Sequence, residues 1–218
     1  MKNTLHICYS NDTNLEIGID EAGRGPMIGR VYSAAVILPK MDYKYELMKD
    51  SKRFSSERKL LEVSEYIKKN AILWGIGYAT EKEIDELNIR KATHKAMHRA
   101  IDDLFTGIQP NIEYHLLVDG NDFIPYTFIQ NETLVQVPHT TIEGGDNKYC
   151  SIAAASILAK VAHDDYIKQL CREDNELDEK YGLLKNKGYG TKIHLEGIKT
   201  YGITKHHRKT FGCCQHYT

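Results

Sequence analysis

A glycine-rich stretch over residues 23–29 separates two apolar runs of strand length, residues 15–19 and residues 31–38. Glycines at this density cannot continue either run, and so short a link predicts that two consecutive strands lie side by side as a meander. Ser55 is a plausible N-cap for the helix that follows, and residues 71–79 have the pattern of a third strand. The first part of the chain therefore predicts three consecutive strands of one sheet.

The second part of the chain combines helices with short strands. Apolar residues at helical spacing predict a helix over residues 89–105, and a short buried strand over residues 115–118 ends directly at Asp119. Residues 133–137 are predicted to form a further strand, and the alanine-rich run over residues 151–170 is the strongest helix prediction in the chain. This order of elements indicates an α/β fold with a mixed central β-sheet flanked by helices.

The charge of the chain is distributed unevenly. Its 218 residues suit one domain, and residues 180–211 carry seven lysines and one arginine against one acid, a net +7 that leaves -8 for the rest. We expect a single domain over residues 1–218, with a sheet-and-helix core over about residues 1–172 and a basic helical C-terminal arm over about residues 173–218. Such an arm suits a polyanion, and an acidic core suits metal ions, although a solvated basic helix without a partner is the alternative.

The sequence also excludes several classes of protein. No window approaches about eighteen uninterrupted apolar residues, and the N-terminus lacks the apolar centre of a secretory signal. We therefore expect no membrane partner and a cytoplasmic, intracellular location. The five cysteines are odd in number and form no CxxC pair, so reduced thiols are expected.

Four carboxylates stand at the ends of predicted elements. Asp20 and Glu21 follow the first strand, Asp119 ends a later strand, and Asp146 precedes the alanine-rich helix. Any one of them alone is more often a turn residue or a helix cap. Like charges about 4 Å apart repel by roughly 4 kcal/mol per pair at an effective dielectric near 20, so a cluster of four needs cations. Oxygen ligands select Mg²⁺ or Mn²⁺ over zinc, and two such ions can act in phosphodiester cleavage.

The triplet Gly23-Arg24-Gly25, with Gly29 beyond it, superficially matches a dinucleotide-binding fingerprint. That fingerprint opens a helix, whereas this stretch leads into a β-branched strand and follows two carboxylates that would repel a pyrophosphate. Glycines also let backbone N–H and C=O groups approach a ribose closely enough to test for its 2′-hydroxyl. We therefore favour a ribose-reading turn.

The segment GIDEAGRGP over residues 18–26 resembles the opening signature of type 2 ribonucleases H, also called ribonuclease HII. Further segments match the family in order along the chain: DSK (50–52), EIDELNIRKATHKAMHRA (83–100), LVDGN (117–121), GGD (144–146), AASILAKV (154–161), GYGT (188–191), GIT (202–204) and HRKTF (207–211). The resemblance spans nearly the whole chain. It implies a ribonuclease H-like fold, and the GRG triplet separates the sequence from type 3 ribonucleases H.

The resemblance also implies roles for individual residues. The catalytic and metal-binding carboxylates would be Asp20, Glu21, Asp119 and Asp146, with two ions of Mg²⁺ or Mn²⁺ in the active complex. Arg24, with Gly23 and Gly25, would read the 2′-hydroxyl, Lys52 would contact a backbone phosphate, and Tyr189 would pack on the deoxyribose next to the ribonucleotide. The substrate-binding set is completed by Lys160, Asp164, Lys187, Lys192 and Arg208.

The activity implied is endonucleolytic hydrolysis that leaves 3′-hydroxyl and 5′-phosphate ends. Its substrates would be RNA/DNA hybrids and DNA duplexes that contain ribonucleotides, with incision 5′ of a single ribonucleotide. We expect a monomer, and the tail FGCCQHYT is too short to decide whether a sliding clamp recruits it.

Two positions depart from the family pattern. The usual arginine after the AKV run is His163, and the serine often found before AASI is Ala153. We expect His163 on a solvated helix face as a tolerated substitution rather than a proton shuttle. Two rival functions stay open: another two-metal nuclease or resolvase of the same fold, and a catalytically silent hybrid-binding module.

Overall fold

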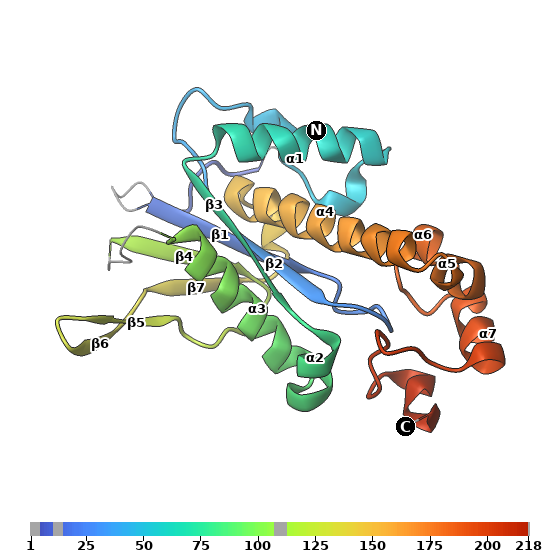
Figure 1. Ribbon diagram of the computed structural model, residues 1–218. Helices are drawn as coiled ribbons and strands as arrows, with labels where there is room; N and C mark the ends of the chain where they lie inside the picture. The colour runs from blue at the N-terminus through green and yellow to red at the C-terminus, as the bar shows by residue number, and fades with distance from the viewer. Residues whose placement is uncertain (1–4, 11–14, 107–112, 218) are drawn as a thin grey trace.

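A five-stranded mixed sheet forms the centre of the protein (Figure 1). The computed structural model describes residues 5–10, 15–106 and 113–217. The strand order is β3-β2-β1-β4-β7, in which β2 is antiparallel to both β1 and β3, β4 is parallel to β1, and β7 is parallel to β4. The strands are β1 Leu15–Ala22, β2 Val31–Ile37, β3 Leu73–Ala79, β4 Tyr114–Asp119 and β7 His139–Ile142. The predicted α/β class with a mixed sheet is confirmed.

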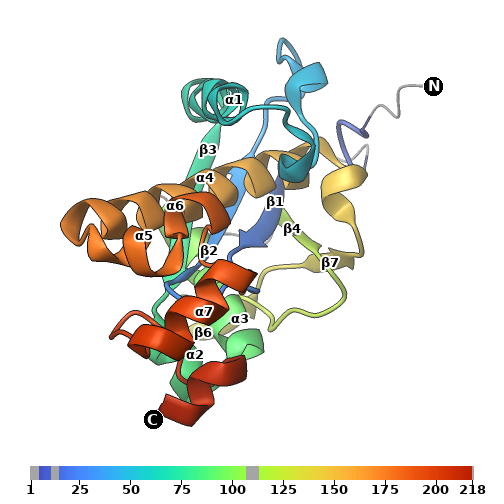
Figure 2. The ribbon, with the colours of Figure 1, turned by 90° about the vertical axis from the view of Figure 1, so that its right-hand side faces the viewer.

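Helices cover both faces of this sheet (Figures 1 and 2). On one face lie α4 (Cys150–Glu173) and α1 (Glu57–Asn70), and on the other lies α3 (Ile89–Leu104), which α2 (Glu81–Leu87) precedes. The alternation of side chains along β2 sets these two layers. Ala34 and Val36 pack in the cluster with α1 and α4, whereas Ala35 and Ile37 pack in the cluster with α3.

Glycines let the two main helices approach the sheet closely. A Cβ added at Gly18 in β1 would lie 2.1 Å from the backbone carbonyl carbon of Ser151 at the start of α4. A Cβ at Gly77 in β3 would lie 2.3 Å from the backbone nitrogen of Ala100 in α3. The start of α4 is therefore pressed against β1, the strand that ends in Asp20 and Glu21.

The C-terminal segment packs beyond the far end of α4 (Figure 2). It contains α5 (Glu176–Tyr181), α6 (Leu183–Asn186), α7 (Lys192–Tyr201) and a 3-10 helix over Gly212–Tyr217. Tyr181, Leu183 and Ile198 form one buried cluster with Ile28 and Ile167. The C-terminal helices are thereby joined both to α4 and to the loop between β1 and β2.

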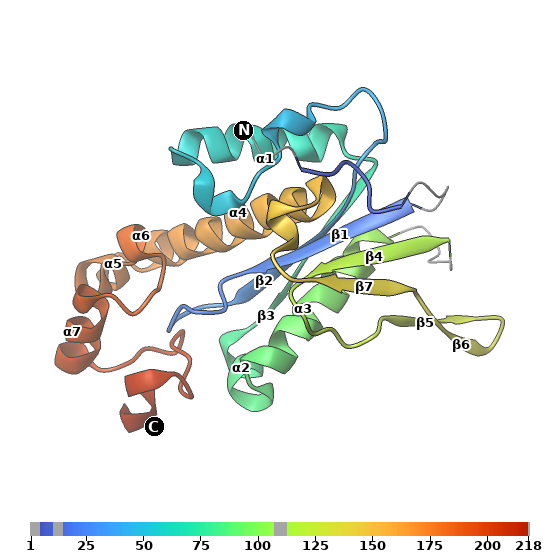
Figure 3. The same ribbon diagram turned by 180° about the vertical axis from the view of Figure 1, so that it is seen from behind.

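Two details differ from the sequence prediction. Ser56, and not Ser55, caps α1, and its side chain accepts a hydrogen bond from the Lys59 amide. The predicted strand over residues 133–137 is β6 (Thr133–Gln136), which pairs with β5 (Thr127–Gln130) in a separate hairpin (Figure 3). Apolar residues in this hairpin, such as Leu134 at 69% exposure, largely face the solvent. Their sequence pattern is nevertheless the same as that of a buried strand. The strand that pairs with β4 at the edge of the central sheet is instead β7, whose side chains are half-buried and mostly polar.

No helix in residues 5–10, 15–106 or 113–217 is long and apolar enough to cross a membrane.

We expect Gly18→Ala to lower the free energy of unfolding by about 3 kcal/mol, because its methyl group would overlap backbone atoms that cannot rotate away. Gly144→Ala is the control, since its Cβ would meet nothing within 4 Å and only the φ of 62° opposes it. Urea unfolding of both variants measures the difference. Equal destabilisation would show that the contact between β1 and α4 is looser than described.

Candidate active site

The four predicted carboxylates line one pocket of about 400 Å³. Asp20 and Glu21 lie at the end of β1, and Asp119 is the last residue of the parallel neighbour β4. Asp146 lies in a 3-10 turn directly before α4. The Asp119 Oδ1 accepts a hydrogen bond of 2.6 Å from the Gly145 amide, which ties this turn to the end of β4. Sheet pairing and one loop contact thus bring acids from three segments together.

Burial and mutual repulsion make this cluster costly to ionise. Asp20 is 5% exposed, and burial raises its pKa well above the ordinary value, with the charges of Glu21 and Asp119 adding to the effect. Burial also raises the pKa of Asp119, and the charge of Asp146 adds to it. Burial raises the pKa of Glu21 despite the opposing charge of Arg24. Bound cations would relieve this strain by favouring the ionised form.

The donor set fits a hard divalent cation, because it consists of carboxylate oxygens around one polar pocket. In the part of the chain that the structure describes, no three acidic, histidine or cysteine side chains already converge as a ready-made ion site. The Glu21 carboxylate instead accepts a hydrogen bond of 3.1 Å from the Arg24 guanidinium. Arg24 thus serves as the counter-ion of Glu21. A metal ion held by Glu21 would either bind the carboxylate together with Arg24 or displace Arg24 from it.

Cations and hydroxyls line the same pocket as the carboxylates. Lys52 and Lys160 both line it, as predicted for substrate contacts. Lys160 is oriented by Asp164, whose Oδ1 lies 2.7 Å from its Nζ, so Asp164 acts behind the pocket lining. Ser51 and Ser156 also line the pocket, with 3.1 Å between their hydroxyl oxygens. These two serines were not predicted, although they stand in the matching segments DSK and AASILAKV.

His163 lies inside the protein and not on a solvated helix face, so that expectation is wrong. Its exposure is 1%, and its Nδ1 lies 3.1 Å from the Asp164 carboxylate, which therefore accepts from Nδ1–H. The ring packs against Gly23, where an added Cβ would lie 2.4 Å from Cδ2. Burial lowers the pKa of His163 and so favours the neutral ring, which supports the glycine loop at the pocket.

The buried Arg208 shapes the loop that follows β1. Arg208 is 0% exposed, and its guanidinium donates hydrogen bonds to four backbone carbonyl groups. The acceptors are Gly23 O at 2.6 Å, Gly29 O at 2.8 Å, Arg24 O at 2.9 Å and Arg30 O at 3.1 Å. Arg208 therefore holds the backbone of the loop from the interior and does not lie on the surface, unlike the exposed Lys52 and Lys192.

This anchoring also orients the amides of the loop. The C=O and the following N–H of a trans peptide point in opposite directions. Because the carbonyls of Gly23 and Arg24 point inward to Arg208, the amides of Arg24 and Gly25 point away from it. Both residues line the pocket, and within the described residues neither amide donates to a protein acceptor. The loop thus presents two backbone donors beside the carboxylates.

Tyr189 completes the pocket from the C-terminal side. Its side chain is exposed, at 45%, as expected for a turn between glycines. An added Cβ at Gly25 would lie 3.0 Å from the Tyr189 ring, and the Met27 amide donates to the Gly188 carbonyl at 2.8 Å. The two glycine loops therefore pack on each other. Of the other predicted contacts, Lys187 and the exposed Lys192 do not line this pocket.

The comparisons with known proteins agree with this geometry. The family model described as Ribonuclease HII matches residues 17–214. A ribonuclease HII of Parabacteroides distasonis is 48% identical over 203 residues, which cover 93% of this chain and 92% of that protein. The chain belongs to the ribonuclease HII family. It is thus a ribonuclease H, an endoribonuclease that hydrolyses phosphodiester bonds.

Solved structures of other ribonucleases H share the fold. The ribonuclease H2 of Pyrococcus horikoshii has a TM-score of 0.69 at 22% identity, covering 93% of this chain and 96% of its own. The RNase HII in a PCNA complex from Archaeoglobus fulgidus gives 0.65 at 23% identity, with 91% and 95% covered. Bst-RNase HIII in complex with Mn²⁺ gives 0.65 at 19% identity, with 87% and 63% covered.

In this ribonuclease HII, a chain of hydrogen bonds holds the backbone of Tyr189. The His194 Nδ1 lies 3.1 Å from the Tyr189 carbonyl, and the Nε2 atoms of His194 and His207 lie 3.1 Å apart. The Thr204 amide donates to the His207 Nδ1 at 3.0 Å. A carbonyl only accepts and an amide only donates, so His194 carries its proton on Nδ1 and His207 on Nε2. Both rings must be neutral for the chain to form.

The neutral pair His194–His207 predicts that the free energy of unfolding falls in mild acid. Burial lowers the pKa of His194, and burial together with the neighbouring ring lowers the pKa of His207 to about 3. The unfolded rings titrate near 6.5, so below about pH 6.5 the unfolded state binds more protons, and for His207 this holds down to about pH 3. The stabilisation is complete above pH 6.5 and is lost as the pH falls, by about 1.4 kcal/mol per pH unit for His207.

Urea unfolding between pH 7.5 and 5 should therefore show a shallower pH dependence for His207→Asn than for the wild type. The exposed His216→Asn is the matched control and should keep the wild-type slope. If His207→Asn also keeps the wild-type slope, the neutral pair is not the source of the acid sensitivity.

Proposed function

We propose that this ribonuclease HII hydrolyses the RNA strand of RNA/DNA hybrids and incises 5′ of single ribonucleotides in duplex DNA. Two ions of Mg²⁺ or Mn²⁺ act in the complex, and the products carry 3′-hydroxyl and 5′-phosphate ends. One observation carries the proposal: a single pocket combines four carboxylates with outward-facing loop amides and an exposed tyrosine ring. Phosphodiester chemistry and ribose recognition can therefore take place on adjacent nucleotides.

The carboxylates Asp20, Glu21, Asp119 and Asp146 would hold the ions. When bound, such ions activate a water molecule and stabilise the leaving oxygen in phosphodiester hydrolysis. Lys52 and Lys160, which line the same pocket, supply positive charge for the phosphates on either side of the cut. Lys187 and Lys192 lie outside the pocket and would extend this positive charge along the duplex.

Ribose recognition is assigned to the glycine loop. The amides of Arg24 and Gly25 can donate to the 2′-hydroxyl oxygen, which both donates and accepts hydrogen bonds. A deoxyribose offers no such oxygen, and the loop cannot relax toward it because Arg208 holds its carbonyls. The Tyr189 ring would then pack on the sugar of the following deoxynucleotide. Another two-metal nuclease has no need of this ribose-reading arrangement, so all-DNA duplex is the discriminating substrate.

Asp119→Asn should lower turnover by at least about 100-fold while leaving duplex binding nearly unchanged. The amide oxygen of Asn can still accept from the Gly145 amide, so the turn before α4 keeps its contact with β4 and only the charge of the metal ligand is lost.

Turnover should also vanish in chelator and return with Mg²⁺ or Mn²⁺. Asp165→Asn, at an exposed acid on α4, is the control and should cleave normally. Turnover of Asp119→Asn within a few-fold of wild type, or cleavage after full chelation, would refute the metal-site assignment.

Tyr189→Ala should lower kcat/KM for single-ribonucleotide incision by about five- to 150-fold, the range for losing one stacked ring. Cleavage of a long RNA/DNA hybrid should fall less, because a uniform hybrid has no unique junction for the ring to select. Tyr189→Phe keeps the ring and serves as the control. Steady-state kinetics on both substrates, with melting curves to verify folding, measure the effect. Equal losses on both substrates would mean that Tyr189 supports binding in general.

A further inference from the structure

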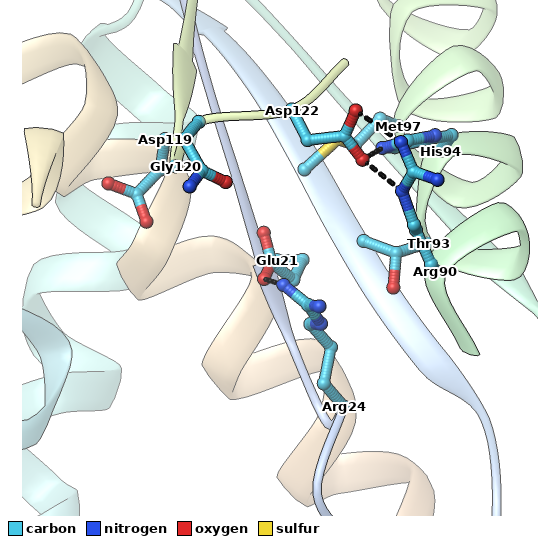
Figure 4. Close-up of a pocket in the computed structure, with 10 residues that line it drawn as sticks. Glu21, Arg24, Arg90, Thr93, His94, Met97, Asp119, Gly120 and Asp122 are labelled. Atoms are coloured by element: carbon cyan, nitrogen blue, oxygen red, sulfur yellow. Dashed lines mark hydrogen bonds and ion pairs between the residues drawn. The ribbon is translucent and has the colours of Figure 1, made fainter. Parts of the chain in front are cut away.

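A second pocket, of about 490 Å³, adjoins the active site (Figure 4). It shares Glu21, Arg24 and Asp119 with the first pocket. Its far wall is one face of α3, which contributes Arg90 and His94, and the loop after β4 closes it. A strand of nucleic acid that crosses the carboxylates can therefore continue directly into this second pocket.

Arg90 is held in place on that wall. Its Nε and Nη2 donate to the two oxygens of Asp122, the latter at 2.8 Å. The Asp122 carboxylate also lies 3.1 Å from Nε2 of His94, which is 5% exposed and so fixes the carboxylate to α3. The pair with Asp122 uses two of the five guanidinium N–H groups. Because the Arg90 side chain is 67% exposed, the other donors remain accessible to a ligand.

The start of α3 favours an anion at this position. Its first turn carries Arg90 and Lys91 and no acid. Cations at a helix N-terminus oppose the helix dipole, which is positive at that end. Among the charged residues that line the pocket, Glu21 pairs with Arg24, Asp122 pairs with Arg90, and Asp119 belongs to the proposed ion site. The accessible Arg90 donors and the start of α3 can therefore meet a phosphate group.

The direction of the strand follows from which residues line which pocket. Tyr189 lines only the first pocket and Arg90 only the second, with Glu21 and Asp119 shared between them. The proposed function places the nucleotide 3′ of the ribonucleotide at Tyr189. The strand therefore leaves the carboxylates toward Arg90 on the 5′ side of the cut.

We propose that the second pocket binds the cleaved strand 5′ of the cut, and that Arg90 contacts the first backbone phosphate beyond the scissile one. This inference rests on the proposed function for the direction of the strand. It makes Arg90 a substrate-binding residue that Asp122 and His94 position. The sequence prediction contained none of these three residues.

The test compares three duplexes that contain one ribonucleotide. The first is full length. In the second, the cleaved strand begins at the nucleotide immediately 5′ of the cut and lacks a 5′-phosphate, so the phosphate assigned to Arg90 is absent. In the third, the same number of nucleotides is removed from the 3′ end of that strand. Arg90→Ala is measured beside Arg58→Ala, which removes an exposed arginine from a similar surface ion pair on α1.

Arg90→Ala should lower kcat/KM by about tenfold on the full-length and 3′-shortened duplexes, as expected for one charge-assisted contact. On the 5′-shortened duplex it should match the wild type within about twofold. Arg58→Ala should match the wild type on all three. Equal losses on all three duplexes, or a loss that disappears only on 3′ shortening, would overturn the inference.

A binding measurement separates this inference from the proposed function. Fluorescence anisotropy with labelled versions of the same duplexes, in chelator, needs no cleavage. Arg90→Ala should weaken full-length binding and reduce the log–log salt slope by about one phosphate, with no change for the 5′-shortened duplex. Wild-type protein that binds in this pattern but does not cut would refute the proposed function alone. Wild-type cleavage with unchanged binding by Arg90→Ala would refute the Arg90 assignment alone.

Discussion

The repulsion among the buried carboxylates is the constraint on which the rest of the site depends. Parallel pairing of β1 with β4 places Asp20, Glu21 and Asp119 at the same edge of the sheet, and the turn before α4 adds Asp146. Each pair of charges about 4 Å apart costs roughly 4 kcal/mol at an effective dielectric near 20. The sheet and α4 withstand this cost because they are packed through backbone contacts, such as that at Gly18, which side-chain rotation cannot release.

Positive groups surround the cluster without neutralising it. Arg24 pairs with Glu21, and Lys160 is held by Asp164. Lysines and arginines at the edge of the cluster attract a phosphate backbone, while the acids keep their oxygens for divalent ions. The same pocket therefore contains both carboxylates and cations. The cations let a polyanion approach a group of carboxylates.

Much of this arrangement could be predicted from the sequence, because it follows from the ends of regular elements. Asp20 and Asp119 terminate strands whose apolar runs are plain, and Asp146 precedes the most distinct helix. The interior places of Arg208 and His163 could not be predicted, since both residue types usually lie at the surface or at its edge. Their burial depends on backbone carbonyls and on a glycine that are distant in sequence.

Prediction of the fold from the sequence has a similar limit. The hairpin β5–β6 and the strand β7 follow each other within a few residues, and each strand has four residues. Over so short a length, alternation of apolar and polar side chains does not distinguish a solvent-facing hairpin from a sheet edge. Pairing with β4 determines which strand joins the sheet, because the Leu116 amide of β4 donates to the Pro138 carbonyl directly before β7. That contact is a tertiary property that the local pattern does not encode.

The loop to which we assign ribose recognition also depends on a residue that is distant in the sequence. Its donors are backbone amides, which no substitution in the loop removes unless it introduces proline. What can vary is the group that turns their carbonyls inward, and this group is Arg208, 184 residues from Arg24 along the chain. Burial lowers the pKa of Arg208 to about 10, so the guanidinium stays protonated at neutral pH and keeps donating to four carbonyls. Removing it would leave those carbonyls buried without a donor, at about 1–3 kcal/mol each. Under the proposed function, the choice between ribose and deoxyribose is therefore encoded as much in the C-terminal segment as in the glycines of the loop.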